Sequence, residues 1–209
     1  MVGPSSSHTA GACRIGQMAR ALCGGTPDRA ALELHGSFAK TGEGHGTDRA
    51  LVGGLLGFAP DDPRLREALG LAASAGLEAV FSTTRLRHVH PNSVRLTLQR
   101  GDQTLVAVGS SLGGGRIAVV EIDGLAVDLS GEYPTLVVIA HDQPGMLAAI
   151  TAELTRSEVN VATVRVSRNR PGGFALHVYE LDLTPPGAVV DAVAHLPAVA
   201  SVRLLPQLM

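Results

Sequence analysis

The chain has 209 residues, of which 45% are hydrophobic and 17% charged, and its formal net charge is −2. This composition provides a core for one large or two small domains and excludes an intrinsically disordered chain. Only 3% of the residues are aromatic, tryptophan is absent and there is no basic run, which excludes the stacking and phosphate-binding surfaces of a nucleic-acid partner.

Hydropathy patterning sets an expectation about location. No apolar run approaches the roughly 18 residues that a membrane span requires. The first residues are polar and Gly-rich, whereas a secretory signal is basic and then apolar. We therefore expect no membrane partner and a cytoplasmic protein.

In chain order, the first 130 residues predict a mixed domain of the α+β or α/β class. Helical spacing and capping signals predict helices over 9–22, 47–58 and 61–76. Alternating or β-rich runs predict strands over 31–39, 94–98, 104–111 and 115–127, the last broken by the hairpin signal Asp123-Gly124. The Gly-rich stretch 40–46 is expected to be a loop, and the stretch 110–116 to join two strands.

A linker is expected over 129–134, and the remainder has a clear order of elements. Strands are predicted over 135–141, 159–169, 174–183 and 199–205, with helices over 144–158 and 186–196. This β-α-β-β-α-β order is that of a ferredoxin-like domain. The predicted domains are therefore 1–130 and 134–209.

Two polar, glycine-framed runs are the candidate sites of the first domain. In "GPSSSHTAGA", residues 3–12, the hydroxyls of Ser5, Ser6 and Ser7 precede a helix start near Thr9, where free N–H groups favour an anion. His8 is expected to face the same point. The alternative interpretation of such a run is a frayed tail.

The second run is "GEGHGTD", residues 42–48. Its glycines, Gly44 among them, allow a close approach of the backbone. His45 is presented between two glycines, with Thr47 and Asp48 beside it. The alternative interpretation is an ordinary loop.

The two cysteines exclude some chemistry. On one helix, Cys13 and Cys23 would be about 15 Å apart at a rise of about 1.5 Å per residue, too far for a disulfide or a shared metal ion. We interpret them as semi-buried thiols in a reducing compartment. His88 and His90 have the spacing of a metal pair, but we interpret His90-Pro91-Asn92 as a structural turn, so no metal site is predicted.

The stretch "HDQPGMLAAITAELTRSEVNVATVRVSR", residues 141–168, resembles the ACT domain, a small regulatory module that commonly binds amino acids. The resemblance covers nearly all of 134–205. It implies a carboxylate at the helix N-terminus by Gly145, with His141, Gln143 and Asn160 near that turn. Asn160 is expected to close the site from a paired second copy. The alternative is an ACT fold that only dimerises or docks on a partner.

Four separated motifs, at 3–12, 37–58, 90–96 and 110–124, resemble the β chain of the two-subunit, iron–sulfur-dependent L-serine dehydratases. The resemblance implies a lyase that converts L-serine to pyruvate and ammonia. It implies His8 and His45 as catalytic residues. It also implies a set of substrate-binding residues, namely Ser5, Ser6, Ser7, Thr9, Gly44, Thr47 and Asp48.

The same resemblance implies a partner α subunit that carries a [4Fe–4S] cluster. The two cysteines of this chain do not match cluster ligation, so the iron is expected to come from that partner. Self-association through the ACT domains is also expected. The competing hypothesis is a non-catalytic amino-acid sensor, in which an ACT domain follows a substrate-binding domain that has lost its activity.

Overall fold

The computed structural model describes residues 7–208, without the side chain of Glu43. The chain divides into two compact units, Met1–Gly124 and Leu125–Met209. The stretch 129–134, where we expect the linker, thus lies within the second unit.

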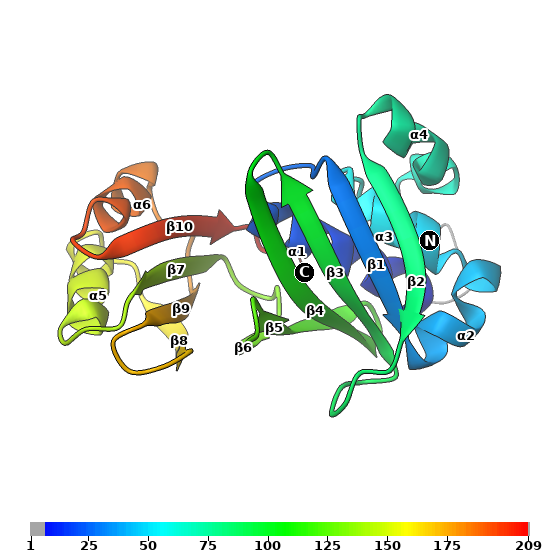
Figure 1. The fold of residues 1–209 in the computed structure, drawn as a ribbon. Coiled ribbons are helices and arrows are strands. Elements are labelled where there is room, and N and C mark those ends of the chain that lie inside the picture. Colours follow the sequence, from blue (N-terminus) through cyan, green and yellow to red (C-terminus); the bar gives the residue numbers. More distant parts are fainter. Residues whose placement is uncertain (1–6, 209) are drawn as a thin grey trace. The chain divides into compact units, whose positions relative to one another are not determined.

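The first unit is an open sheet with helices (Figure 1). Its helical elements are a short π-helix η1 (Ser7–Gly11), α1 (Ala12–Cys23), α2 (Gly36–His45), α3 (Thr47–Leu55), a 3-10 helix η2 (Pro63–Glu67) and α4 (Ala68–Ser74). Its strands are β1 (Arg29–His35), β2 (Glu78–Thr84), β3 (Asn92–Arg100), β4 (Gln103–Gly113) and β5 (Arg116–Ile122).

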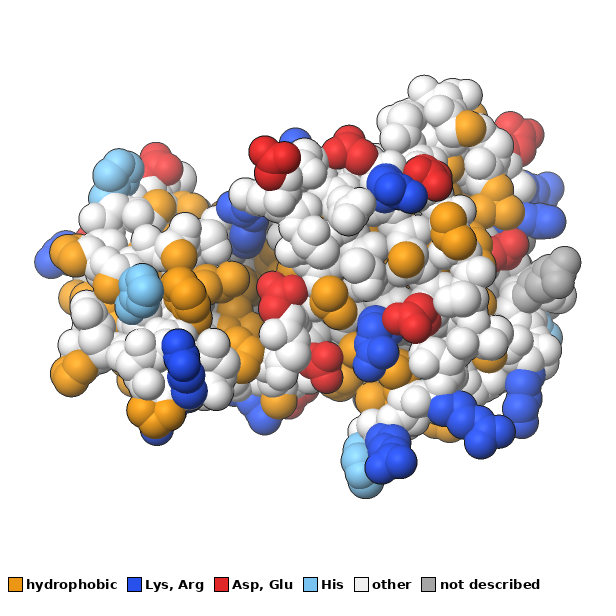
Figure 2. All heavy atoms as spheres, viewed as in Figure 1, with side chains coloured by type: hydrophobic (Ala, Val, Ile, Leu, Met, Phe, Trp, Pro, Cys, Tyr) orange, Lys and Arg blue, Asp and Glu red, His pale blue; other side chains and the backbone are white. Residues whose placement is uncertain are grey.

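These strands lie in the order β2-β1-β3-β4-β5. β1 is parallel to β2, and the other pairs are antiparallel. Helices α1 and α3 cover one face of the sheet and leave the other open (Figure 1). The open face carries positively and negatively charged side chains (Figure 2). They include the surface ion pairs Arg29–Glu78 and Arg95–Glu33.

Helices α1 and α3 touch backbone to backbone. A Cβ added to Gly54 would lie 2.0 Å from the carbonyl oxygen of Cys13, and one added to Gly16 would lie 2.3 Å from that of Leu51. Both distances are far inside van der Waals contact, so the two glycines are what allow this approach. The close contact fixes the start of α3 relative to α1.

The structure corrects three sequence-based expectations in this unit. The predicted loop 40–46 is mostly the second half of α2, and the predicted strand 31–39 ends at His35. The reason is tertiary: Phe38 is fully buried, and its burial offsets the low helix propensity of the glycines. The predicted helix 61–76 is two elements, η2 and α4.

Strand β2 was not predicted at all. Its burial alternates only weakly, because the strand lies at the edge of the sheet with one face open. A half-exposed edge strand has little hydrophobic periodicity to detect.

The second unit has the predicted ferredoxin-like order. After β6 (Leu125–Leu129), the elements of this order are β7 (Thr135–His141), α5 (Met146–Arg156), β8 (Val161–Arg168), β9 (Phe174–Leu181), α6 (Gly187–Ala194) and β10 (Val199–Leu205). The four-stranded sheet has the order β10-β7-β9-β8. Its core is formed by apolar residues of β7, β9, α5 and α6, among them Leu136, Val138, Ile150, Tyr179 and Val193.

The mixed fold class predicted from the sequence is therefore confirmed. No helix within residues 7–208 is both long enough and apolar enough to cross a membrane.

Candidate functional site

The candidate site of the first unit is built around the π-helix η1. This five-residue element leads directly into α1 and packs against α2, α3 and β4. It contains three of the predicted residues, Ser7, His8 and Thr9. Ser5 and Ser6 lie outside the described residues.

His8 is buried, with 8% of its surface exposed. Its Nε2 atom lies 3.1 Å from Thr41 Oγ1 and 3.3 Å from Ser37 Oγ. The ring also meets the edge of Phe38, with 5.3 Å between the ring centroids. Helix α2 thus holds His8 by two hydroxyls and an aromatic ring.

His45 is the last residue of α2 and lies beside His8. The two ring centroids are 4.9 Å apart and the rings are tilted by 36°. The Nδ1 atom of His45 is 2.9 Å from the carbonyl oxygen of Thr41. The two histidines predicted from motifs 37 residues apart therefore come together at one place.

The surroundings of His8 favour its neutral form. Burial of the ring is the main reason that the pKa of His8 lies below its usual 6.5, and the nearby charge of His45 lowers that pKa further. A hydrogen bond with the Ser37 backbone partly opposes the shift. At neutral pH the ring is therefore an uncharged imidazole, the form that accepts a proton.

Buried polar atoms without a hydrogen-bond partner occur on the elements that surround His8. Within residues 7–208 they include Thr9 Oγ1, Thr47 Oγ1, Asp48 Oδ1 and Ser111 Oγ. The first three belong to the predicted substrate-binding set. Because buried polar groups are normally hydrogen-bonded, this unmet capacity fits a site that receives a small polar molecule.

Gly44 differs from the rest of the predicted set. It is exposed, and a Cβ added to it would meet no atom within 4 Å. The described structure therefore places it on the surface of α2, apart from these buried atoms.

The end of β4 and the turn between β4 and β5 pack against η1 and the start of α1. Ser111 is fully buried and packs against Gly11, and a Cβ added to Gly113 would lie 3.9 Å from Ser7 Oγ. Arg14 of α1 donates a hydrogen bond from Nη1 to the carbonyl oxygen of Gly115, at 2.7 Å. The stretch 110–116, predicted only to join two strands, is thus also a neighbour of the candidate site.

Sequence reasoning missed Ser37, Thr41 and Ser111 as parts of this site. Ser37, Thr41 and His45 are spaced four residues apart, which places them on one side of a helix. That signal was hidden because the Gly-rich stretch was interpreted as a loop.

The cysteines do not fit an iron–sulfur cluster. Cys13 and Cys23 are buried on one helix. Burial raises the pKa of Cys13 to about 12, and its Sγ donates to the carbonyl oxygen of Phe58 at 3.2 Å. Cluster ligands are thiolates, whereas this thiol stays protonated. Across the described part of the chain, no three His, Cys, Asp or Glu side chains are grouped to hold a metal ion.

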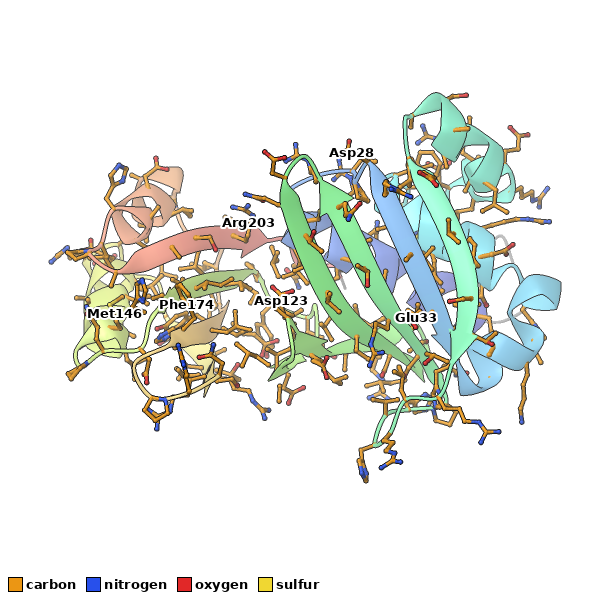
Figure 3. All side chains as sticks on the ribbon, in the orientation of Figure 1. Asp28, Glu33, Asp123, Met146, Phe174 and Arg203 are labelled. Carbon is orange, nitrogen blue, oxygen red and sulfur yellow. The ribbon has the colours of Figure 1, made fainter. Side chains whose placement is uncertain are left out.

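The second candidate site is the turn between β7 and α5. Gly145 precedes α5 with φ of 91°, a left-handed conformation that suits glycine. His141 stacks on Phe174 of β9, with 4.5 Å between the ring centroids, and Figure 3 labels Phe174 together with Met146 at the start of α5. Gln143 is exposed, and its Nε2 lies 3.7 Å from the sulfur of Met146.

The carboxylate of Asp142, beside this turn, is held by two interactions. It pairs with Arg168 at 2.8 Å and accepts a hydrogen bond from the backbone N–H of Gly172 at 3.2 Å. The hydrogen bond with Arg168 is the main reason that the pKa of Asp142 lies below its usual value. The turn therefore has a fixed conformation.

Asn160 does not lie near that turn in the same chain, and the sequence-based expectation places it there from a paired second copy. His141 pairs with Phe174, whereas Val161 pairs with Leu181 at the other end of β9. Seven residues at about 3.3 Å each separate these ends by roughly 23 Å. Asn160 instead donates from Nδ2 to Asp182 Oδ2 at 2.7 Å. Only the Asn160 of a second copy could approach the turn.

Comparisons with known proteins agree with both resemblances. The family model of the serine dehydratase β chain matches residues 1–78, and that of the ACT domain matches residues 134–197.

Three relatives extend this finding. The chain is 43% identical over 185 residues to the L-serine dehydratase β chain of Peptoniphilus asaccharolyticus, covering 87% of this chain and 83% of that one. It is 39% identical over 202 residues to the probable L-serine dehydratase β chain of Bacillus subtilis, covering 97% and 92%. A D-3-phosphoglycerate dehydrogenase of Methanocaldococcus jannaschii is 25% identical over 201 residues, which are 91% of this chain but 36% of that enzyme.

Proposed function

Because the chain belongs to the L-serine dehydratase β-chain family, we propose that its His8–His45 pair is the proton-accepting centre of L-serine deamination. L-serine dehydratases form pyruvate and ammonia, and the reaction requires removal of the α-proton of serine. The observation that supports the assignment is the neutral, buried His8 with its ring 4.9 Å from that of His45. A neutral imidazole in a water-poor site is a suitable general base.

The groups around this pair would hold the rest of the substrate. Ser7, Thr9 and Thr47 supply hydroxyl donors for a carboxylate, and Asp48 supplies an acceptor for the α-ammonium group. Three of these side chains have a buried atom without a hydrogen-bond partner among residues 7–208, so binding would satisfy them. Ser5 and Ser6 belong to the proposed binding set on the basis of the family motifs, and Gly44 belongs to it on that basis alone, since it lies on the surface of α2.

A partner α subunit completes the enzyme in this proposal and carries the [4Fe–4S] cluster. The donors of this chain do not fit a cluster, because its cysteines are buried and the Cys13 thiol is protonated. Departure of the β-hydroxyl group is assigned to that subunit. The two buried cysteines form no disulfide, which also suits a reducing compartment, so we place the enzyme in the cytoplasm.

Anaerobic reconstitution with the α subunit tests the catalytic assignment. We expect pyruvate release from L-serine, and we expect His8→Ala and His45→Ala each to lower kcat by about 10²–10⁴-fold, the usual contribution of acid–base catalysis. His88→Ala, in an exposed loop, is the matched control. Turnover equal to the native rate in both site variants would remove these histidines from the mechanism. Failure of every pairing to release pyruvate would favour the non-catalytic sensor.

The second unit supports a regulatory function. We propose that it binds a small amino acid, with L-serine as the first candidate, between two copies of the chain. The N-terminus of α5 beside Gly145 would receive the carboxylate. His141 and Gln143 would contact the amino or hydroxyl group. The partner copy would supply Asn160, since Asn160 of the same chain is at the opposite end of the sheet.

A further inference from the structure

The first unit has a surface pocket that the proposed function does not use. The pocket lies where the parallel strands β1 and β2 end, beside the start of α2 and the loop that follows β2 (Figure 1). Its volume is about 840 Å³, within the range of about 300–1,000 Å³ that small-molecule sites occupy. The carboxyl ends of parallel strands are a common place for ligands, so this pocket has the size and the position of a binding site.

The lining of the pocket carries three full positive charges and no carboxylate. Lys40 belongs to α2, and Arg85 and Arg87 belong to the loop after β2. Within residues 7–208, the side chain of Glu43 apart, none of these three side chains forms an ion pair or a hydrogen bond. Figure 2 shows Lys and Arg side chains gathered over this end of the first unit. Because the whole chain has a net charge of −2, this is a local excess of positive charge, and it favours an anion.

His35 adds a hydrogen-bond donor to the lining. Its Nδ1 accepts a hydrogen bond from the backbone N–H of Leu86, at 3.2 Å. A backbone N–H can only donate, so in the neutral ring the lone pair is on Nδ1 and the hydrogen is on Nε2. The same contact holds the start of the arginine-bearing loop against the end of β1. Nε2–H of His35 has no partner among the described residues, which leaves it for a ligand.

Two threonine hydroxyls complete the polar lining. Thr84 lies directly across from His35 in the parallel pair, and Thr83 precedes it. The three cations can only donate hydrogen bonds, and so can the imidazole while its Nδ1 is occupied. The matching ligand has groups that only accept, which are phosphate and carboxylate groups, and the fork of an arginine suits both.

The pocket and the histidine pair lie on different sides of α2. Gly36, Ala39 and Lys40 line the pocket, and their spacing of three and four residues places them on one side of the helix. Ser37 and Thr41, which contact the buried histidine, lie on another side. An anion in the pocket would therefore touch this helix without occupying the candidate substrate site.

We propose that this pocket binds a small molecule with at least two negative charges, a phosphate ester or a polycarboxylate, held by Lys40, Arg85 and Arg87. The several cations call for more than one negative charge, and the volume admits a molecule larger than a single inorganic ion. The inference goes beyond the proposed function and does not depend on it, because it concerns binding by the free chain.

NMR of the full chain without a partner tests the proposal, with pyrophosphate and citrate as the two probes. The ionic strength is held constant with sodium chloride, since salt screens exposed charges. We expect saturable shifts of the Leu86 amide and of the His35 ring. Arg85→Ala should weaken binding roughly tenfold or more, as expected for a lost hydrogen bond between charged groups. Arg66→Ala removes the same charge from an exposed position outside the pocket and should leave the affinity unchanged.

Three results would overturn the proposal. The first is that neither probe shifts the Leu86 amide at millimolar concentration. The second is equal weakening by Arg85→Ala and Arg66→Ala, which would show a general attraction of anions to the surface. The third is that neither probe binds while Arg85→Ala weakens assembly with the α subunit, which would make the pocket a subunit contact.

Discussion

The hydroxyl of Ser111 fills the space beside Gly11 in which any other residue would place its Cβ. A Cβ added to Gly11 would lie 2.0 Å from Ser111 Oγ and 2.8 Å from Ser111 Cβ. Gly11 ends η1, and Ser111 lies in β4, so this contact sets how closely η1 can approach the sheet. The position of His8, three residues earlier, depends on it.

Gly11→Ala should therefore push η1 away from β4. We expect a loss of about 1–3 kcal/mol in the free energy of unfolding, the usual cost of overpacking, together with a fall in kcat. Thermal unfolding and steady-state kinetics measure the two effects. The double variant Gly11→Ala/Ser111→Gly removes the obstructing side chain and should recover most of both losses. An unchanged melting temperature in the single variant would show that the contact is not restrictive.

The pH dependence of catalysis should follow the lowered pKa of His8. The base is active when His8 is neutral, so kcat/KM should be maintained below pH 6.5 and fall only as pH drops through the lowered pKa. His45→Gln removes the neighbouring positive charge that lowers this pKa. The acidic limb of its residual activity should then move to higher pH. A limb that stays in place would contradict electrostatic coupling between the two rings.

Acid should destabilise the second unit through His177. This side chain is 3% exposed, its Nε2 has no partner among the described residues, and burial lowers its pKa despite the opposing charge of Asp142. Because the folded pKa lies below the unfolded value, the unfolded chain binds more protons between the two. Stability is therefore complete above about pH 6.5 and decreases as pH falls toward the folded pKa.

Tyrosine signals report this unfolding selectively. The chain has two tyrosines and no tryptophan, and both Tyr133 and Tyr179 lie in the second unit. The transition seen by tyrosine circular dichroism should shift to lower temperature from pH 7 to pH 5. His177→Phe keeps a ring beside Tyr179 but cannot be protonated, and should reduce the shift. An equal shift in both proteins would assign the acid sensitivity to other groups.

Ligand binding by the second unit can be tested by complementation between copies. Calorimetry with L-serine should show binding to the full chain. Asn160→Ala should weaken it by roughly ten- to a hundredfold, since a hydrogen bond to a charged group contributes about 1.5–3 kcal/mol. His141→Ala should also weaken binding. A mixture of the two variants, once subunits exchange, should regain sites that combine an intact turn with an intact Asn160.

Absence of recovery in the mixture would show that one chain supplies all the contacts. If the native chain releases or absorbs no heat with millimolar L-serine, the second unit does not bind L-serine. In that case its function would be dimerisation or docking.

The second unit could be predicted from the sequence almost completely, and the first only in part. The alternating strand Phe174–Leu181 and the amphipathic helix Met146–Arg156 bury one side each, so local periodicity shows their type. Strand Glu78–Thr84 gave no such signal because it is an exposed edge. Helix Gly36–His45 contains three glycines and is stabilised by the burial of Phe38, which no local pattern reveals.

The candidate site residues also divide into those with a local sequence signal and those without one. His8 and His45 could be proposed as site residues because each lies in a recognisable motif, and the family to which these motifs point is confirmed by the relatives. Thr41 could not be identified, since its importance depends on a helix that the sequence did not predict. The distance between Asn160 and the turn of its own chain could not be predicted, because the register of β8 and β9 is a tertiary property.

The burial of Cys13 and Cys23 has a practical consequence for handling the protein. A buried thiol reacts slowly with oxygen and alkylating reagents, and that of Cys13 is also held protonated, whereas the thiolate is the reactive form. The isolated chain should therefore tolerate air, and slow labelling of its thiols would time the opening of α1. Any loss of activity when the reconstituted enzyme meets oxygen would then report on the proposed α subunit.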